Sequence, residues 1–526
     1  MIKTDIKLPL GYTADDIRSA ICERLPVERC EIGEIVFVKR SLNISDSTDM
    51  HYDATVGIEF SEEREFGLLK MRKKVAKMPD FNLSLPKSQL SSSPVVIGSG
   101  PSGLFAALAL AEAGANPILY ERGLPVDERM KKVSDFERFG ILDTECNVQF
   151  GEGGAGTYSD GKLKVGGMDK YKMKVLLEFA EHGAPEDIVY SVGAHLGTDK
   201  LAKIVKGIRE KIILLGGEVH FGTKLVDLKI KDGKIVGGRV EKDGGVTDFE
   251  AENIILATGH SARDIFELLR RVGAGLEARG FGIGLRIEHP REYINDLVYK
   301  SPSADKLGSA SYHLVTHLEN GRSVYSFCMC PGGEVVAAAS EDGGIVTNGM
   351  SEYARLADNS NSALLISVTP KDFGTDDPLA GTELQRKIEA RAFSLTGGTY
   401  KAPVTSLGAF LSGEKPSLGD VKPSYRRGTE LFDPKEYLPD FVAESLAPAM
   451  ADFDAWMPGF SYSDAVLCGP ETRTTSPIKV LRNDSFEVPG ISGLYPCGEG
   501  AGYAGGIVSS ARDGIMVTEK LLLKNM

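Results

Sequence analysis

Short apolar runs and helical patterns alternate in two separate parts of the chain. Residues 95–97 form an apolar run that stops at a glycine, and a helical pattern with one apolar face follows at 104–111. Further apolar runs lie at 117–120, 253–259 and 494–496, and a last helical pattern extends from about 506 to 524. Continuous apolar runs are typical of parallel strands buried on both faces. We therefore predict one α/β domain with a parallel sheet, assembled from both parts of the chain.

Elements of other kinds lie between these two parts. Helices are predicted at 171–182 and 198–215, and strands at 218–221, 225–230 and 234–241. The turn signals at 232–233 and 243–244 predict that these three strands form a meander. From about residue 273 to 463, strand-like runs recur at 281–288, 311–318, 323–329, 335–339 and 363–368, with a helix at 379–395. This second region predicts a mostly antiparallel sheet with helices, inserted into the first domain as an α+β substrate domain.

The first 90 residues are predicted to form a small separate unit. A capping-box pattern at 13–16 opens a helix after a first strand, and two more strands are predicted at 34–44 and 51–60. This βαββ order predicts a ferredoxin-like α/β domain, for which docking, dimerisation and mechanical support are all open roles. The predicted limits are 1–90 for this appendage and its linker, 91–270 and 466–526 for the two parts of the nucleotide-binding domain, and 271–465 for the substrate domain.

The first strand and helix carry a glycine motif with a clear physical purpose. Gly98, Gly100 and Gly103 form G-x-G-x-x-G at the strand-to-helix turn, and Glu121 follows the next strand. Gly98 permits a tight turn, Gly100 lets a diphosphate approach the backbone, and Gly103 lets helix and strand pack closely. The helix N-terminus then faces the diphosphate, while Glu121 can accept hydrogen bonds from ribose hydroxyls. Glu112 and the Gly/Pro interruptions argue against a membrane span here, so the motif predicts a dinucleotide site.

Two further glycine-rich stretches belong with this site. Six glycines within residues 151–166 cannot lie inside a regular element, and they predict an ordered loop whose amides form an anion-binding nest. Near the C-terminus, Gly498-Glu499 ends a short strand, and six glycines lie between residues 493 and 506 before the last helix. Glu499 is either a ligand-binding carboxylate or an exposed loop residue.

These motifs together resemble a known family. The turn at 98–103 with Glu121, the run Ala257-Thr258-Gly259 and the stretch 497–506 are similar to the FAD-binding signatures of two-dinucleotide-binding-domain flavoproteins. FGEGGAGTYSDGKL, GIGLRIEHP, SFCMCPGG and the C-terminal glycine run resemble a bacterial family of FAD-dependent dehydrogenases of unassigned substrate. The resemblance covers essentially the whole chain. It implies a glutathione-reductase-like FAD domain of the p-hydroxybenzoate-hydroxylase branch.

The resemblance also implies which residues bind the cofactor. Glu499 would bind the ribityl chain, the last helix would point at the flavin pyrimidine, and residues 471–477 would lie against the ring. The expected FAD-binding residues are Gly98, Gly100, Pro101, Ser102, Gly103, Glu121, Arg122, Gly153, Gly154, Gly156, Thr157, Ser159, Lys162, Val226, Thr258, Gly259, Pro477, Gly498, Glu499, Gly502, Gly505, Gly506 and Ile507. The predicted fold is thus a Rossmann-like FAD-binding domain (parallel sheet plus β-meander) with an inserted α+β substrate domain and a small N-terminal ferredoxin-like domain.

Four side chains in the substrate domain are candidates for catalysis. Arg286 and His289 are suited either to binding a carboxylate and moving a proton, or to an internal salt bridge and a buried turn histidine. Cys328 and Cys330 point to the same face if their run is a regular strand. They form either a dithiol relay or small apolar filler near the ring, because a Cys-x-Cys disulfide is strained. No metal site is predicted.

Composition indicates which partners and which compartment this chemistry is expected to have. With 526 residues the chain has room for about three domains, and a net charge of −13 disfavours nucleic acid and anionic membrane surfaces as partners. The N-terminal residues lack an apolar signal segment, and the seven cysteines do not resemble a disulfide framework. We therefore expect a cytoplasmic enzyme with a small-molecule substrate and no membrane span, and we assign no oligomeric state.

The favoured function is an FAD-dependent oxidoreductase that moves a hydride between flavin N5 and an organic substrate. Two alternatives stay open: a flavoprotein with structural FAD that acts through partner binding by the N-terminal domain, and an FAD-dependent hydroxylase. NAD(P)H is a possible transient electron donor. Since the sequence shows one dinucleotide-binding motif, we expect one main catalytic cavity.

Overall fold

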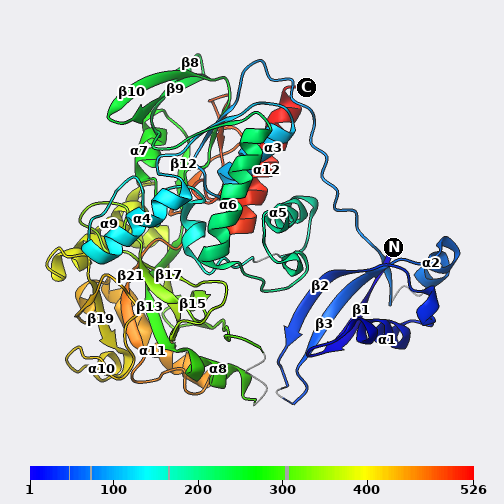
Figure 1. Cartoon of the computed structure of the whole chain (residues 1–526). Coiled ribbons are helices and arrows are strands. Elements are labelled where there is room, and N and C mark those ends of the chain that lie inside the picture. The colour runs from blue at the N-terminus through cyan, green and yellow to red at the C-terminus, as the bar shows by residue number, and fades with distance from the viewer. Residues whose placement is uncertain (47, 71–73, 164–165, 302–306) are drawn as a thin grey trace.

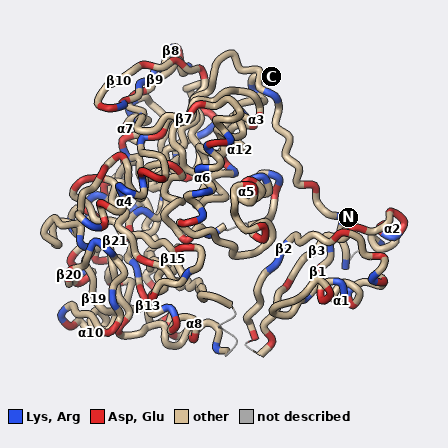
Figure 2. Tube along the Cα trace, viewed as in Figure 1, with Lys and Arg blue, Asp and Glu red and all other residues tan. Residues whose placement is uncertain are grey.

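The computed structural model describes residues 1–46, 48–70, 74–163, 166–301 and 307–526. It shows a large body of two domains and a small N-terminal domain beside it, joined by an extended linker (Figure 1). Basic and acidic residues are interspersed along all three domains in Figure 2. Among the residues that the structure describes, the helices are too short or too polar to cross a membrane.

The first domain of the body is built on a five-stranded parallel sheet in the order β23-β11-β5-β6-β7. Its strands are β5 (Val95–Ile97), β6 (Ile118–Tyr120), β7 (Glu218–His220), β11 (Ile254–Leu256) and β23 (Leu494–Pro496). Its helices are α3 (Pro101–Glu112), α4 (Val126–Phe139), α5 (Lys170–Glu181), α6 (Gly197–Leu214), α7 (Arg263–Arg271) and α12 (Ile507–Lys524). The predicted parallel sheet, shared by both parts of the chain, is confirmed.

Helix α3 is the centre of this domain, since it packs against α6, α12 and the sheet. Every residue from 102 to 111 is buried, which is why this helix is apolar on all sides. The contact with α12 is very close, because a Cβ at Gly514 would lie 2.2 Å from the Ser102 carbonyl oxygen. The packing of α12 on α3 joins the C-terminal segment to the first glycine turn.

The meander differs from the prediction by one strand. It consists of β8 (Lys224–Lys231), β9 (Lys234–Lys242) and β10 (Gly245–Glu250), in the order β10-β9-β8. The predicted first strand at 218–221 is instead β7, which pairs in parallel with β6. The turn at 243–244 signals a hairpin, but β10 itself carries no strand pattern, because its side chains are almost all exposed and it has no apolar alternation.

The second domain of the body is built on a seven-stranded sheet in the order β14-β15-β18-β13-β21-β19-β20. Its strands are β13 (Phe281–Pro290), β14 (Val315–His317), β15 (Ser323–Cys330), β18 (Asn359–Val368), β19 (Ala402–Ser406), β20 (Thr429–Leu431) and β21 (Val466–Glu471). Around it lie α8 (Arg291–Tyr299), α9 (Ala380–Leu395), α10 (Leu407–Ser412), α11 (Asp440–Trp456) and the hairpin of β16 (Glu334–Ala337) and β17 (Thr347–Met350). All neighbours except β19 and β20 are antiparallel, as predicted for this domain.

The chain returns to the first domain after β21. A short antiparallel pair, β12 (Leu276–Ala278) with β22 (Ile478–Val480), lies where the chain leaves and re-enters that domain. Since β21 pairs with β13 and β19, a limit after Glu471 fits the sheet better than the predicted limit at 465. We keep the domain limits as a proposal with this adjustment.

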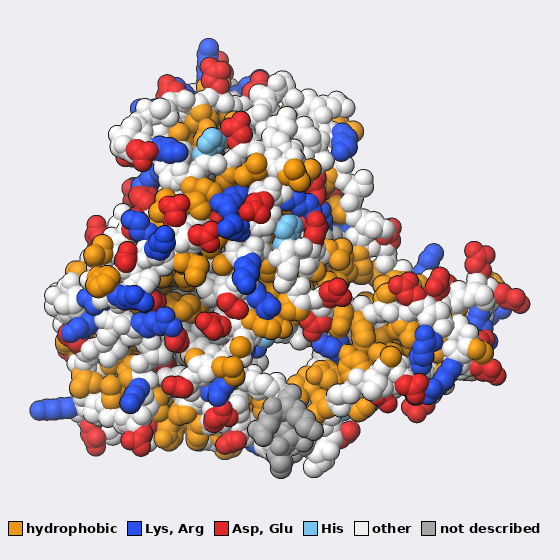
Figure 3. Space-filling model, viewed as in Figure 1, with side chains coloured by type: hydrophobic (Ala, Val, Ile, Leu, Met, Phe, Trp, Pro, Cys, Tyr) orange, Lys and Arg blue, Asp and Glu red, His pale blue; other side chains and the backbone are white. Residues whose placement is uncertain are grey.

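The N-terminal domain has the ferredoxin-like order that the sequence predicts, extended by two elements. It contains β1 (Ile2–Pro9), α1 (Ala14–Arg24), β2 (Ile35–Asn43), β3 (His51–Ile58), α2 (Glu62–Leu69) and β4 (Ala76–Lys77), with an antiparallel sheet ordered β2-β3-β1-β4. Arg40 of β2 exchanges backbone hydrogen bonds with residues 190–192, and its guanidinium donates to Asp187. Phe37 stacks on Tyr190 with ring centroids 4.8 Å apart. Figure 3 shows hydrophobic side chains gathered on the side of this domain that faces the body.

Candidate functional site

A cavity of about 300 Å³ lies between the two domains of the body. Its first wall comes from the 98–102 turn, the 149–162 loop, the end of β11 and the start of α12, and its second wall from β15, β17 and the end of β21. Of the expected cofactor residues, the wall contains Gly98, Gly100, Pro101, Ser102, Glu121, Arg122, Gly154, Gly156, Ser159, Lys162, Thr258, Gly259, Glu499, Gly505, Gly506 and Ile507. The fold therefore gathers segments that are more than 400 residues apart in the chain around one space.

The first glycine turn has no room for side chains. Gly98 has a φ of +100°, and a Cβ there would lie 2.5 Å from the Ala257 carbonyl oxygen. A Cβ at Gly103 would lie 1.8 Å from the carbonyl oxygen of Gly98. Gly103 therefore lies under the cavity wall and allows α3 to approach β5, as the motif predicts. Gly100 caps α3 without a side-chain hydrogen bond, which leaves the backbone amides of the first turn for an anionic ligand.

Glu121 organises the turn around it. One of its carboxylate oxygens accepts hydrogen bonds from the amide and hydroxyl of Ser99, at 2.7 and 2.8 Å. The other accepts from the amides of Gly123 and Gly151, at 2.9 and 3.0 Å. Four donors match the acceptor capacity of a carboxylate. Glu121 thus holds the two glycine loops together and also lines the cavity.

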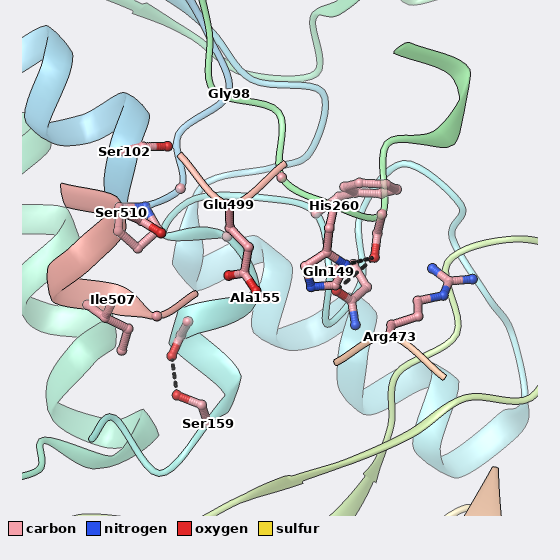
Figure 4. A pocket seen from close by; sticks show the side chains of 18 of the residues that line it. Gly98, Ser102, Gln149, Ala155, Ser159, His260, Arg473, Glu499, Ile507 and Ser510 are labelled. Carbon is pink, nitrogen blue, oxygen red and sulfur yellow. Dashed lines mark hydrogen bonds between the residues drawn. The ribbon is translucent and has the colours of Figure 1, made fainter. Parts of the chain in front are cut away.

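The opposite end of the first wall is formed by the C-terminal glycine run. Figure 4 shows the Glu499 side chain pointing into the cavity toward Ala155, with Ile507 and Ser159 beside it. Burial raises the pKa of Glu499 to about 7, and Arg279 opposes this only weakly. Gly506 caps α12 without a side-chain hydrogen bond, and a Cβ at Gly505 would meet no protein atom within 4 Å.

These features allow us to ask whether FAD would fit the cavity. Two uncapped helix N-termini face one cavity, so it suits a ligand with an anionic diphosphate and a polar ring edge. The open space before Gly505 and before Gly259 leaves room for such a ligand against bare backbone. The chain's residues fit a dinucleotide cofactor that lies along the first wall.

Several expected cofactor residues lie beside the cavity and not in its wall: Gly103, Gly153, Thr157, Val226, Pro477, Gly498 and Gly502. A Cβ at Gly153 would lie 2.1 Å from the Thr157 hydroxyl, so the loop is closely packed at these two residues. The Gly498 amide donates to Asp513 of α12 at 2.7 Å. In β8 the wall contains Leu225 in place of its neighbour Val226.

Arg286 and His289 both lie in the core of the second domain. Arg286 forms an ion pair with Glu471, with 2.6 Å between Nε and Oε2, and donates to the carbonyl oxygen of Cys328 at 2.8 Å. It therefore supports two residues of the second wall from behind. His289 lies 2.8 Å from the Phe460 carbonyl oxygen, and burial lowers its pKa to about 4. These positions fit the internal salt bridge and the buried histidine of the sequence alternatives.

Cys328 and Cys330 both line the cavity, but their strand is not regular there. A bulge between Phe327 and Cys330 interrupts β15, and Cys328 has a φ of +38°. Cys328 is exposed and Cys330 is buried, and the regular strand on which a shared face for the two thiols depended is absent here. No disulfide joins them, and burial raises the pKa of Cys330 to about 12.

The expected list omitted several residues of the wall, among them Gln149, His260, Ser261, Asn348, Glu471 and Arg473. Figure 4 shows Gln149, His260 and Arg473 together on the side away from Ile507. Burial and the Arg473 guanidinium lower the pKa of His260 to about 4, so its ring is neutral at neutral pH. The sequence contains a signal for His260, because this histidine directly follows the run Ala257-Thr258-Gly259. The segment 471–477 was likewise placed against the ring by resemblance.

One group on α5 has the spacing of metal ligands. Glu178, Glu181 and His182 bring their ligand atoms within 4.8 Å of one another. Lys174 and Lys211 already bind the Glu178 carboxylate, at 2.6 and 2.8 Å. Two ammonium groups at that carboxylate favour a structural salt-bridge network.

Comparisons with known proteins identify a family model, a full-length relative and distant structural likenesses. Residues 280–474 match the family model described as "FAD-dependent protein, C-terminal domain-like". An uncharacterized protein of Clostridium beijerinckii is 44% identical over 531 residues, covering 99% of this chain and 98% of that protein. Among solved structures, a flavin-dependent brominase has a TM-score of 0.39 at 10% identity, covering 82% of this chain and 80% of that chain.

A glycerol-3-phosphate dehydrogenase of Bacillus halodurans, complexed with FAD, has a TM-score of 0.34 at 10% identity and covers 83% of this chain and 65% of that chain. These two structural likenesses are too distant to bear on the reaction. The evidence for the family is the relative that matches over the full length, together with the family model for the second domain. The chain therefore belongs to the same family as the Clostridium beijerinckii protein, and its second domain is of the FAD-dependent C-terminal type.

Proposed function

We propose that the protein transfers a hydride between a small organic substrate and N5 of FAD, in the cavity between the two domains. The proposal rests on one observation, which is that each of the two domains contributes a wall to the same continuous cavity. One is formed by the glycine motifs of the first domain and the other by β15, β17 and the end of β21. FAD, when bound, supplies the two-electron carrier. A substrate against the second wall would be held at a domain interface, where active sites commonly lie.

The chain's own residues would hold and orient both ligands. Uncapped amides at the starts of α3 and α12 would bind the anionic groups of the cofactor. Glu121 keeps the two glycine loops in place through its four hydrogen bonds, and Glu499 offers a carboxyl group to the ribityl chain. The second domain would exclude water from the reacting atoms.

The first test is the identity of the cofactor and its reduction. We expect a yellow protein that releases FAD, and not FMN, on denaturation, because the turn at 98–103 serves a dinucleotide. Anaerobic stopped-flow mixing with NADH, NADPH and a panel of metabolites should bleach the flavin with at least one donor. A colourless protein that cannot be reconstituted with FAD would refute the proposal. Stable FAD that no donor reduces would favour a structural cofactor.

We propose further that NAD(P)H, if used, visits the same cavity. The part of the chain that the structure describes contains one strand–glycine turn–helix unit of this kind, so a second ordered nucleotide site has no scaffold. Reduction and substrate turnover should then alternate, giving parallel lines in double-reciprocal plots and NAD(P)H dissociation constants weaker than about 10 μM. Crystals with NAD(P)H and an organic substrate in separate ordered pockets would overturn this proposal.

A further inference from the structure

The second wall and the adjoining loop carry four charged side chains that reach the cavity: Asp160, Lys162, Glu471 and Arg473. Three of them are neutralised by partners behind the wall. Glu471 pairs with Arg286 at 2.6 Å, and Arg473 pairs with Glu389 at 3.0 Å. Asp160 accepts hydrogen bonds from Ser351 and from two nitrogens of Arg355. None of these three charges is available to balance a ligand.

Lys162 is different. Its ammonium donates to the carbonyl oxygen of Met329 in β15, which places it against the second domain. Among the described residues, no carboxylate lies within salt-bridge distance of it. Asp160 attracts it electrostatically, but burial has the larger effect and lowers the pKa of Lys162, and both oxygens of Asp160 are already held by Arg355. Lys162 therefore brings an uncompensated positive charge to a partly buried position in the cavity wall.

The groups behind the wall add to this bias. Arg263 and Arg473 share the buried carboxylate of Glu389, and Glu341 is divided between Arg263 and the more exposed Arg386. Around the second wall and its support, four carboxylates (Asp160, Glu341, Glu389 and Glu471) lie with five cations (Lys162, Arg263, Arg286, Arg355 and Arg473), and Lys162 is the cation of this set that forms no ion pair among the described residues. A wall of this kind attracts an anion and orients it at the one charge without a partner.

We propose that the substrate carries a carboxylate and that Lys162 binds it. This inference rests on the proposed function and names its substrate class. The carboxylate would replace the Met329 carbonyl as acceptor for the ammonium, which gives a charge-assisted hydrogen bond at a partly buried position. The rest of the substrate would then extend along Cys328 and Asn348 of the second wall.

The test uses the oxidised FAD-loaded protein and pairs of small probes. Benzoate, succinate and pyruvate are titrated by calorimetry and by flavin absorbance at constant ionic strength, beside the neutral amides of the same acids. At least one acid should bind more tightly than its amide. Lys162→Met and Lys162→Gln should weaken that binding by roughly 10- to 100-fold, as expected for loss of a hydrogen bond to a charged group. FAD content and the flavin reduction potential are measured in each variant.

A matched control is Lys206→Met, since Lys206 is a lysine of α6 that pairs with Asp127 and is not part of the cavity wall. It removes the same charge and should leave acid binding unchanged. The proposal is wrong if the amides bind as tightly as the acids, if the Lys162 variants bind the acids normally, or if no acid binds. A shift in reduction potential without a change in acid binding would assign Lys162 to the flavin. A protein that binds no FAD would instead refute the proposed function. Calorimetry of the acids would then still show whether Lys162 binds a carboxylate.

Discussion

The two walls of the cavity are built by different means. On the first wall the surface is largely backbone, from the turn at 98–103, the loop at 151–156 and the glycines before α12. On the second wall it is made of side chains whose charges are balanced by partners in the core, such as Arg286 and Glu389. A backbone wall is damaged by adding a methyl group, whereas a wall of ion pairs is damaged by removing one charge. The first wall should therefore be most sensitive to a glycine-to-alanine substitution, and the second wall to the loss of one charged side chain.

The largest effect should come from a methyl group in the first wall. In Gly103→Ala the new Cβ would lie 1.8 Å from the Gly98 carbonyl oxygen, so strand and helix must separate. We expect loss of bound FAD and a drop in unfolding free energy of more than about 3 kcal/mol, measured by flavin content and urea unfolding. Gly67→Ala in α2 is the control, because its Cβ meets no atom within 4 Å and should be neutral or slightly stabilising. Normal FAD content in Gly103→Ala would contradict this account of the turn.

The matching experiment on the second wall removes one charge. Glu389 is buried, and the guanidiniums of Arg263 and Arg473 lie 2.8 and 3.0 Å from its oxygens. Burial alone would raise the pKa of Glu389, but the two cations hold it well below its ordinary value. Glu389→Gln removes the buried carboxylate that both cations share and leaves only the partly exposed Glu341 beside them, so we expect a loss of about 3–5 kcal/mol in unfolding free energy near neutral pH.

The pH dependence of that loss follows from the lowered pKa of Glu389. The pairing stabilises the protein at pH values above the ordinary carboxyl pKa and is lost as the pH falls and the carboxylate is protonated. The difference between the parent and Glu389→Gln should therefore shrink in acid. Glu383→Gln, which removes an exposed partner of Arg386, is the control and should change stability by less than about 1 kcal/mol. Equal losses in the two variants would mean that burial of the cluster contributes little.

The same contrast explains what could be predicted from the sequence. The turn at 98–103, Glu121 and the glycines before α12 are local patterns, and the structure places them in or beside the cavity wall, while their part in binding FAD stays a prediction. The ion pairs of the second wall join residues far apart in the chain, for instance Arg286 with Glu471 and Arg263 with Glu389. No periodicity or spacing links such residues before the sheet is known. This is why the sequence offers Arg286 as a candidate for catalysis but does not show that Glu471 neutralises it.

The missed elements of the fold have a similar cause. Strand β10 is exposed along nearly its whole length, and β4 is a two-residue exposed strand at the sheet edge. Neither has the apolar alternation by which strands are found. Strand β7 was found but assigned to the meander, because its partner β6 precedes it by about 100 residues. Each of these strands is defined by the strand with which it pairs, and not by a pattern in its own sequence.

A smaller effect should separate stability from function at Glu499. A carboxyl group whose pKa is raised to about 7 by burial makes the FAD-free protein less stable as the pH rises from its ordinary value of 4.5 toward 7. Since the side chain faces the cavity, we expect Glu499→Gln to stabilise the FAD-free protein by only about 1–2 kcal/mol near pH 8. The two proteins should be equally stable at a pH near 4.5. Thermal unfolding across this range, with the exposed Glu277→Gln as control, checks the sign; a less stable variant at high pH would contradict it.

The smallest effect is expected at the two cysteines. The bulge in β15 separates their environments, and burial raises the pKa of Cys330 to about 12, so its thiol is not ionised at neutral pH. Cys328→Ala, Cys330→Ala and the double variant should therefore keep flavin reduction within about tenfold of the parent rate, which corresponds to about 1.4 kcal/mol. Rates are compared per bound FAD, so that any loss of folded protein is excluded. If the double variant binds FAD normally yet loses more than roughly a thousandfold in turnover, the thiols are part of the chemistry, and the second wall does more than bind and position the substrate.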